Sequence, residues 1–246
     1  MMLLSHKRVF ASFFVLSACW TACRAQETEL SIFQEEAGGQ SILFRGMEAE
    51  QYSVQANGHP YFSSPVFGKG EIVFEGRRYP DITLNIDAVA QRVIVMMPSG
   101  LNAVALLPES VEEVLTDGHR YTGVASGAAD GLPEGIYEVF GQGPEQVYKH
   151  VVKHLSESAT PVNGDRIGYF DEHYNPDLIK YYGITTRYYF RDADGHFSRI
   201  RGTGALLRKL GDRRKTVRKA LRESGLTGPG TDFDQVCRLA LTLPSV

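Results

Sequence analysis

Residues 81–87 read Asp-Ile-Thr-Leu-Asn-Ile-Asp, with apolar side chains at every second position. Successive side chains of a β-strand point to opposite faces, so this period of two predicts a strand with one buried and one solvated face. Strand-like runs flank it at 71–75, 92–97 and 101–107. The same period continues from about residue 41 to 202, which predicts that this part of the chain is mostly β-sheet.

Turn sequences separate these runs. Glu75-Gly76 and residues 98–100 (Pro-Ser-Gly) lie between the early runs, and Asp117-Gly118 and Asp194-Gly195 lie between later ones. Asp-Gly between two strand-like runs is a strong hairpin signal. No helical stretch here is long enough to connect parallel strands. We therefore predict an antiparallel meander of about ten strands over residues 26–202, forming a curved sheet or a sandwich.

After residue 201 the apolar residues take helical spacing in three short segments. They are Leu206, Leu207 and Leu210; Val217, Ala220 and Leu221; and Val236, Leu239, Ala240 and Leu243. Thr203 and Asp212 are suitable N-caps for the first two helices, which Gly211 and Gly225 would end. Because such amphipathic helices need a partner surface, residues 203–246 are expected to pack on the sheet, which makes the fold class α+β.

Composition and charge narrow the class of protein. The 246 residues are 43% hydrophobic and 22% charged, which is typical of a globular chain and excludes a disordered one. The net charge of −3 excludes a strongly basic nucleic-acid binder. Residues 26–202 carry 14 Lys+Arg and 25 Asp+Glu, a net −11, whereas residues 203–246 carry 9 and 4, a net +5.

The N-terminus is typical of a secretory signal. Residues 6–8 read His-Lys-Arg, and an apolar run follows at 9–20 that is too short to span a bilayer. We favour ordinary cleavage after Ala25, which makes 1–25 a signal peptide. The alternative is a lipobox at 16–19, in which Cys19 would be acylated. Either route predicts an exported protein, in the periplasm or associated with the outer membrane.

The cysteines add little to this assignment. Cleavage after Ala25 leaves Cys237 as the single cysteine, so no internal disulfide can form, whereas lipobox cleavage would retain Cys23 as a possible partner. Beyond the N-terminal segment, apolar stretches such as Val93–Met97 are far too short to be transmembrane helices.

The sequence contains no convincing catalytic or metal-binding motif. Ser126 lacks the Gly-x-Ser-x-Gly spacing of a nucleophile elbow. His150 and His154 are four residues apart, but without the adjacent glutamate of a helical zinc pair we interpret them as exposed histidines. Residues 171–173 (Asp-Glu-His) are interpreted as a polar loop, and 192–195 (Asp-Ala-Asp-Gly) as a hairpin turn. We predict no catalytic residue, no metal and no cofactor.

Two sets of residues are candidates for binding. Residues 57–62 read Asn-Gly-His-Pro-Tyr-Phe, so His59, Tyr61 and Phe62 could line a ligand cleft or plug the end of the core. The second set is basic and lies on the first two helices: Arg208, Lys209, Arg213, Arg214, Lys215, Arg218, Lys219 and Arg222.

For the basic residues we favour a solvated face that complements an acidic sheet over a surface that binds anionic lipid headgroups or another polyanion. The binding candidates within this set are Arg213, Arg214, Lys215 and Arg218. Peripheral membrane contact through the helices is a possible partner interaction. Nucleic acid is not expected, because no aromatic residues are interleaved with the basic ones.

The order of these features resembles a group of uncharacterised exported proteins of Gram-negative bacteria. The resemblance rests on residues 57–62, 70–87 and 93–100, and on the basic, leucine-rich segments 206–210 and 213–226. Its motifs are structural, and it implies no activity and no site residue. The chain departs from the group at the Thr227–Gly230 insert and in its apolar end.

These observations favour a non-catalytic exported envelope protein with a binding or scaffolding role. Its partner would be an unknown envelope protein or an apolar or anionic ligand. The alternative is a periplasmic carrier of a lipid or other apolar ligand, enclosed between a curved sheet and the helices. A third hypothesis is a hydrolase of unknown substrate that uses His59 or residues 171–173.

Overall fold

The computed structural model describes residues 41–52, 56–127, 131–158 and 179–243, and the chain forms two compact units. The first unit is Met1–Arg45, of which residues 41–45 are described, and they contain the short 3-10 helix η2 (Ile42–Phe44). The second unit, Gly46–Val246, contains the sheet and the C-terminal helices.

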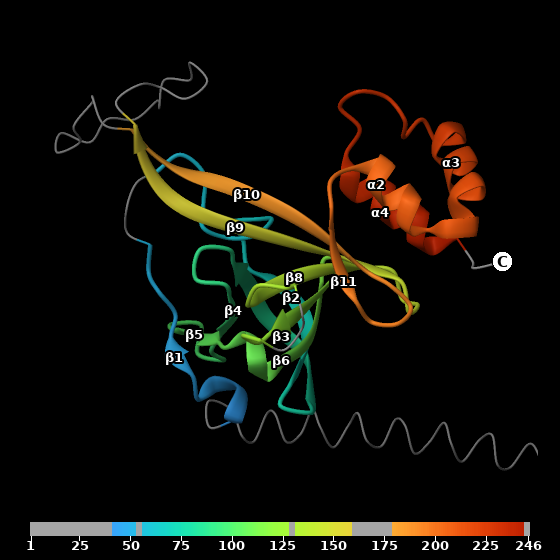
Figure 1. The fold of residues 1–246 in the computed structure, drawn as a ribbon. Helices are drawn as coiled ribbons and strands as arrows, with labels where there is room; N and C mark the ends of the chain where they lie inside the picture. The colour runs from blue at the N-terminus through green and yellow to red at the C-terminus, as the bar shows by residue number, and fades with distance from the viewer. Residues whose placement is uncertain (1–40, 53–55, 128–130, 159–178, 244–246) are drawn as a thin grey trace, which may run out of the picture. The chain divides into compact units, whose positions relative to one another are not determined.

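The second unit is built on an antiparallel sheet of eleven strands, in the order β1-β5-β4-β3-β2-β6-β7-β8-β9-β10-β11 (Figure 1). The strands are β1 (Met47–Glu48), β2 (Gly68–Phe74), β3 (Arg77–Asp87), β4 (Arg92–Met96), β5 (Ala103–Leu106), β6 (Val111–Thr116), β7 (His119–Val124), β8 (Gly135–Phe140), β9 (Gln146–Ser158), β10 (Ile179–Arg191) and β11 (Phe197–Ile200). The predicted antiparallel meander is confirmed. Consecutive strands are neighbours from β2 to β5 and from β6 to β11, and β2 pairs with β6 where the two runs meet.

The turn residues explain two of these hairpins. Glu75 and Gly76, between β2 and β3, have φ of 49° and 72°, and Asp117 and Gly118, between β6 and β7, have φ of 51° and 74°. Two successive residues with positive φ form a type I′ turn, whose backbone twist matches the twist of the two strands that it joins. Glycine adopts a positive φ without steric cost. The Asp117-Gly118 hairpin is therefore confirmed.

The predicted solvated face of β3 is wrong at its end, because Asn85 and Asp87 are buried with exposed fractions of 9% and 1%. The chain before β2 covers them. Asn85 Nδ2 donates to the carbonyls of Ser64 and Val66 at 2.9 and 3.2 Å. Polar side chains can be buried there because their hydrogen bonds are satisfied by backbone groups.

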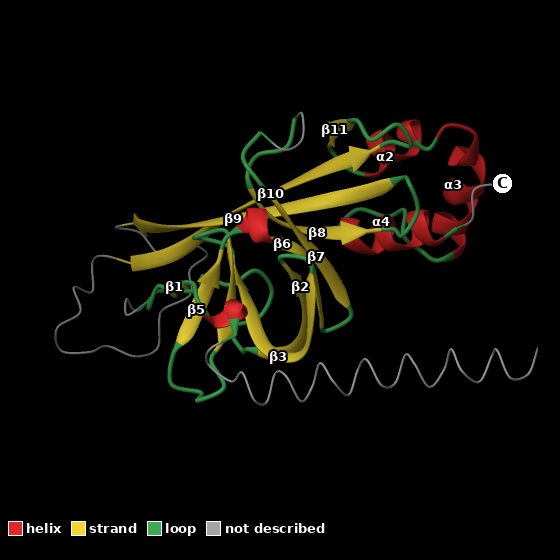
Figure 2. Ribbon diagram, turned by 90° about the horizontal axis from the view of Figure 1, so that it is seen from below, coloured by secondary structure: helices red, strands yellow, loops and turns green. Residues whose placement is uncertain are grey.

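The helices are α2 (Thr203–Lys209), α3 (Arg214–Glu223) and α4 (Phe233–Thr242), with the 3-10 turn η5 (Gly211–Arg213) between the first two. They lie beside β8–β11 in both views (Figures 1 and 2). Their apolar sides share a core with four buried sheet residues, Phe140, Val147, Phe190 and Ile200. Among the described residues no helix is long and apolar enough to cross a membrane.

The predicted helix starts need correction. Thr203 is the first residue of α2, and Gly202 is at the N-cap. Asp212 lies inside η5 and makes no capping hydrogen bond to α3. The η5 turn leads directly into the first turn of α3, so Asp212 is not at its N-cap. The third helix does have a side-chain cap, since Asp232 accepts a hydrogen bond from the backbone of Asp234 at 3.0 Å.

Candidate functional site

The cations of α2 and α3 form a surface that we call the basic face. On α3, residues 214, 215, 218, 219 and 222 span roughly 140° of the helix circumference, at about 100° per residue. Val217 and Leu221, both fully buried, lie outside this arc. All members are exposed except the half-buried Arg218: Arg208, Lys209, Arg214, Lys215, Arg218, Lys219 and Arg222.

The basic face has few anionic partners in the described part of the chain. Its one ion pair there joins Lys219 to Glu223 at 3.8 Å, and both side chains are exposed, at 78% and 65%. Exposed pairs of this kind contribute little and are screened by salt. Because the apolar side of α3 is already buried in the core, its basic side is left to solvent or to a binding partner.

Arg213 does not belong to the basic face, although the sequence groups it there. Its side chain is 13% exposed and its Nη1 donates to Glu145 at 2.6 Å. Its Nη2 donates to the carbonyls of Ala240 and Leu243 at 3.1 and 2.5 Å. Arg213 therefore connects η5 to α4 and to the turn before β9, while Arg214, Lys215 and Arg218 face outward.

The segment containing His59, Tyr61 and Phe62 is held against the sheet. Phe62 is 8% exposed and meets the ring of Tyr121 edge-on at 5.3 Å, so it plugs the core. Buried Lys153 donates to the carbonyls of His59 (3.1 Å) and Tyr61. Burial, together with the charge of Lys153, lowers the pKa of His59 below its usual value. His59 stacks on Tyr61 with 6.3 Å between ring centroids.

A buried carboxylate, which sequence reasoning missed, lies under α4. Glu138 on β8 is 2% exposed, and its Oε1 is 2.6 Å from Nδ1 of His119 and 2.8 Å from Nη2 of Arg238. Its Oε2 is 3.4 Å from Nζ of Lys149. A charge can be buried at this depth when oppositely charged donors surround it.

The network continues from Lys149 into α4, because Lys149 also pairs with Asp234, which accepts a 2.8 Å hydrogen bond from the hydroxyl of Tyr188. Arg238 and Asp234 of α4 are thus bound to side chains on the four neighbouring strands β7, β8, β9 and β10. One sequence signal was available: Gly135–Phe140 is otherwise apolar and carries a single glutamate. Its partners come from distant segments, which no local pattern can connect. The network anchors α4 to the sheet.

The two spaced histidines are not a ligand pair, as predicted, but His150 is not exposed. Both lie on β9, where residues four apart are separated by about 13 Å. His154 is exposed, whereas His150 is 3% exposed and stacks on Tyr137 at 4.5 Å between ring centroids. The interpretation of both as exposed histidines is therefore wrong for His150, which the sheet and Gln91 cover.

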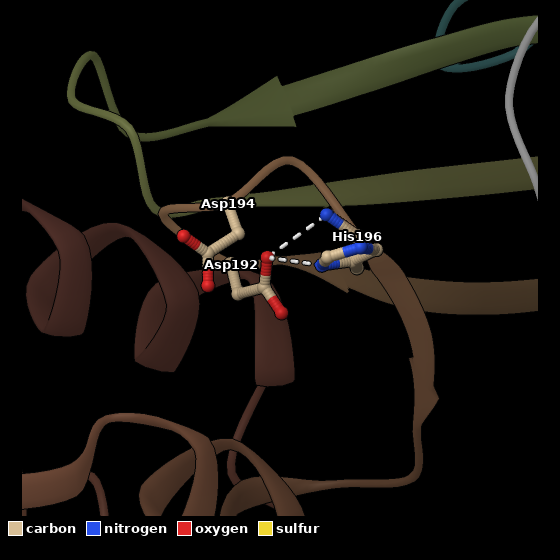
Figure 3. Close-up of side chains that lie close together, drawn as sticks. All are labelled: Asp192, Asp194 and His196. Atoms are coloured by element: carbon tan, nitrogen blue, oxygen red, sulfur yellow. Dashed lines mark hydrogen bonds and ion pairs between the residues drawn. The ribbon is translucent and has the colours of Figure 1, made fainter.

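Asp192, Asp194 and His196 place ligand-type atoms within 4.8 Å of one another in the turn between β10 and β11 (Figure 3). Asp192 accepts a hydrogen bond from the backbone N–H of His196 at 2.8 Å. The side chain of His196 is 81% exposed. These contacts serve the turn, in agreement with the hairpin interpretation of residues 192–195.

Several predicted features lie outside the described residues: the signal peptide 1–25 with Cys19 and Ala25, and the Asp-Glu-His segment 171–173. Comparison with known proteins gives no further guide, since no family model, no curated protein and no solved structure matches the chain.

Proposed function

We propose that this chain is a non-catalytic, exported envelope protein that binds the anionic surface of a membrane through the basic face. The observation that carries the proposal is the set of outward cations on α2 and α3 with a single exposed ion pair among the described residues. A Lys or Arg near an anionic membrane surface contributes about 1 kcal/mol to binding. Several such residues on one rigid helical surface act together.

The contacts of several ionisable groups among the described residues support a non-catalytic role. Glu138 and Lys149 are used to anchor α4, and Arg213 holds η5 against α4. His59 supplies a backbone carbonyl to Lys153, and Phe62 fills the core. Each of these contacts stabilises the fold.

Export rests on the N-terminal sequence, with its positive start at 6–8 and apolar run at 9–20. The mass of the protein recovered from the cell envelope tests this part. Cleavage after Ala25 gives a chain that begins at Gln26, and acylation gives a lipid-bearing chain that begins at Cys19. A full-length chain recovered from the cytoplasm would contradict export.

Membrane binding is tested by co-sedimentation with vesicles of phosphatidylcholine, alone or with anionic phosphatidylglycerol. We expect binding only to the anionic vesicles, weakened by salt because the charges are exposed. The variant Arg214→Gln/Lys215→Gln removes two cations, so binding should weaken by about 2 kcal/mol, or roughly 30-fold.

The matched control is Lys69→Gln/Arg77→Gln, which removes two exposed cations from the sheet with the same change in net charge. It should bind nearly as the wild type does. Equal weakening by the two double variants would show that net charge alone drives binding, and binding to pure phosphatidylcholine would show an apolar contact. Either result would overturn the proposal.

A further inference from the structure

A second surface, far from the basic face in sequence, has the opposite charge. A hollow of about 320 Å³ lies where the chain after β1 passes the end of β3 and the turn between β4 and β5. We call it the acidic hollow. Three carboxylates and three aromatic rings contribute to its wall: Glu48, Glu50, Asp87, Tyr52, Tyr61 and Phe67.

Asp87 is the most constrained of these groups. Its side chain is 1% exposed, and its Oδ1 accepts the backbone N–H groups of Val89 and Ala90 at 2.7 and 2.8 Å. Its Oδ2 accepts the hydroxyl of Tyr52 at 2.6 Å. These bonds fix the carboxylate at the wall of the hollow. They come from neutral donors, so the negative charge itself is not neutralised by them.

No Lys, Arg or His side chain belongs to the described wall of the hollow. Buried Lys153 donates to the carbonyls of His59 and Tyr61, but its side chain is not part of the wall. Burial and the hydrogen bond to Asp87, with the charges of Asp87 and Glu50, raise the pKa of Tyr52 above its usual value. The hollow therefore favours positive charge.

The rest of the wall determines which kind of cation fits. Ile94, Met96 and Leu101 also line the hollow, so much of its surface is carbon. A hard metal ion such as Ca²⁺ needs six to eight oxygen ligands that converge on one point, whereas among the described residues Glu48, Glu50 and Asp87 do not bring their carboxylate oxygens within 4.8 Å of one another. An ammonium group on a short carbon chain is attracted by carboxylates and by aromatic rings, and its carbon atoms can contact the apolar side chains.

We propose that the acidic hollow is a binding site for a small organic ammonium ligand. Asp87 and Glu50 supply the negative charge, Tyr52 and Tyr61 the aromatic wall, and Leu101 the apolar wall. This site is independent of the basic face, and neither proposal requires the other.

The probe is 1,4-diaminobutane, titrated into the full-length protein by calorimetry, with uncharged 1,4-butanediol as the matched ligand control. We expect the diamine to bind and the diol not to bind. Asp87→Asn keeps an oxygen acceptor for the backbone N–H groups but removes the charge, so we expect affinity to fall tenfold or more. Glu50→Gln, at an exposed position, should lower it several-fold.

Glu109→Gln is the control for the protein, since Glu109 is an exposed carboxylate outside the hollow. It should bind as the wild type does, and so should Arg214→Gln/Lys215→Gln, which tests the membrane proposal separately. If Asp87→Asn fails to fold, as circular dichroism would show, the affinity of Glu50→Gln for the diamine still tests whether the carboxylates of the hollow bind the ligand. The proposal is overturned if the diamine does not bind, if the diol or Ca²⁺ competes equally, or if Glu50→Gln binds as the wild type does.

Discussion

Acidification should destabilise the fold through one histidine, His150. Its ring stacks on Tyr137, and its Nε2 is 2.9 Å from Oε1 of Gln91. The amide of Gln91 is oriented by its own donor bonds to the carbonyls of Ala88 and Val151, so its oxygen faces the ring. The Nε2–H therefore donates. Nδ1 is buried without a partner in the described structure, and protonating it would bury an unpaired N–H and a charge.

The size of the effect follows from proton linkage. Burial, with a smaller contribution from the charge of Arg187, lowers the pKa of His150 from 6.5 to about 4. Between these two values the unfolded chain binds the proton and the folded chain does not, so stability falls as the pH falls. From pH 7 to pH 5 this single site should remove about 2 kcal/mol from the free energy of unfolding.

The assay is urea unfolding of wild type and His150→Phe at several pH values. Phenylalanine keeps the stacking on Tyr137, and the oxygen of Gln91 retains the backbone N–H of Ile136 at 3.2 Å. The variant should be less stable at pH 7 but should lose about 2 kcal/mol less than the wild type on going to pH 5. His154→Gln, at an exposed position, should keep the wild-type profile. Parallel pH profiles of wild type and His150→Phe would refute the assignment.

Two further substitutions test the packing. Glu138→Gln replaces the buried carboxylate by a neutral amide and should lower the free energy of unfolding by about 1–2 kcal/mol, because its charge-assisted hydrogen bonds to Arg238 and Lys149 are lost or weakened. A loss no larger than that of exposed Glu109→Gln, measured by urea unfolding, would contradict this. Gly123→Ala places a Cβ 1.9 Å from a backbone oxygen of the 3-10 turn before β6, so a loss of about 1–3 kcal/mol is expected. Gly143→Ala, where a Cβ meets nothing within 4 Å, is its control, and equal melting temperatures of the two variants would contradict the steric explanation.

The sheet could be predicted because its signals are local. Alternation at 81–87 marks a strand, and Asp117-Gly118 marks a turn, and both can be recognised without knowing what covers them. The helices followed from spacing in the same way. Their starts were less predictable: a 3-10 turn precedes α3, so Asp212 lies one residue before the N-cap position, which Arg213 occupies.

The candidate site was less predictable because burial depends on distant segments. The alternating pattern predicts that Asp87 faces solvent, yet the chain that precedes β2, which includes Tyr52, covers it. Arg213 belongs to a basic run in the sequence, yet its side chain is held inward by a hydrogen bond to the carbonyl of Ala240 in α4, 27 residues further along the chain. In both cases the local sequence pattern predicts an exposed side chain, and a hydrogen-bond partner distant in sequence buries it.

The two buried carboxylates of the sheet show how such partners separate a structural role from a binding role. Glu138 is surrounded by Arg238, Lys149 and His119, so its charge is matched inside the protein and a ligand would gain nothing by approaching it. Asp87 is held by neutral donors at the wall of a hollow that no described cation lines. A buried charge with hydrogen bonds but without a counter-charge is stabilised further by any cation that reaches it. The same residue chemistry thus anchors a helix at one end of the sheet and favours a ligand at the other.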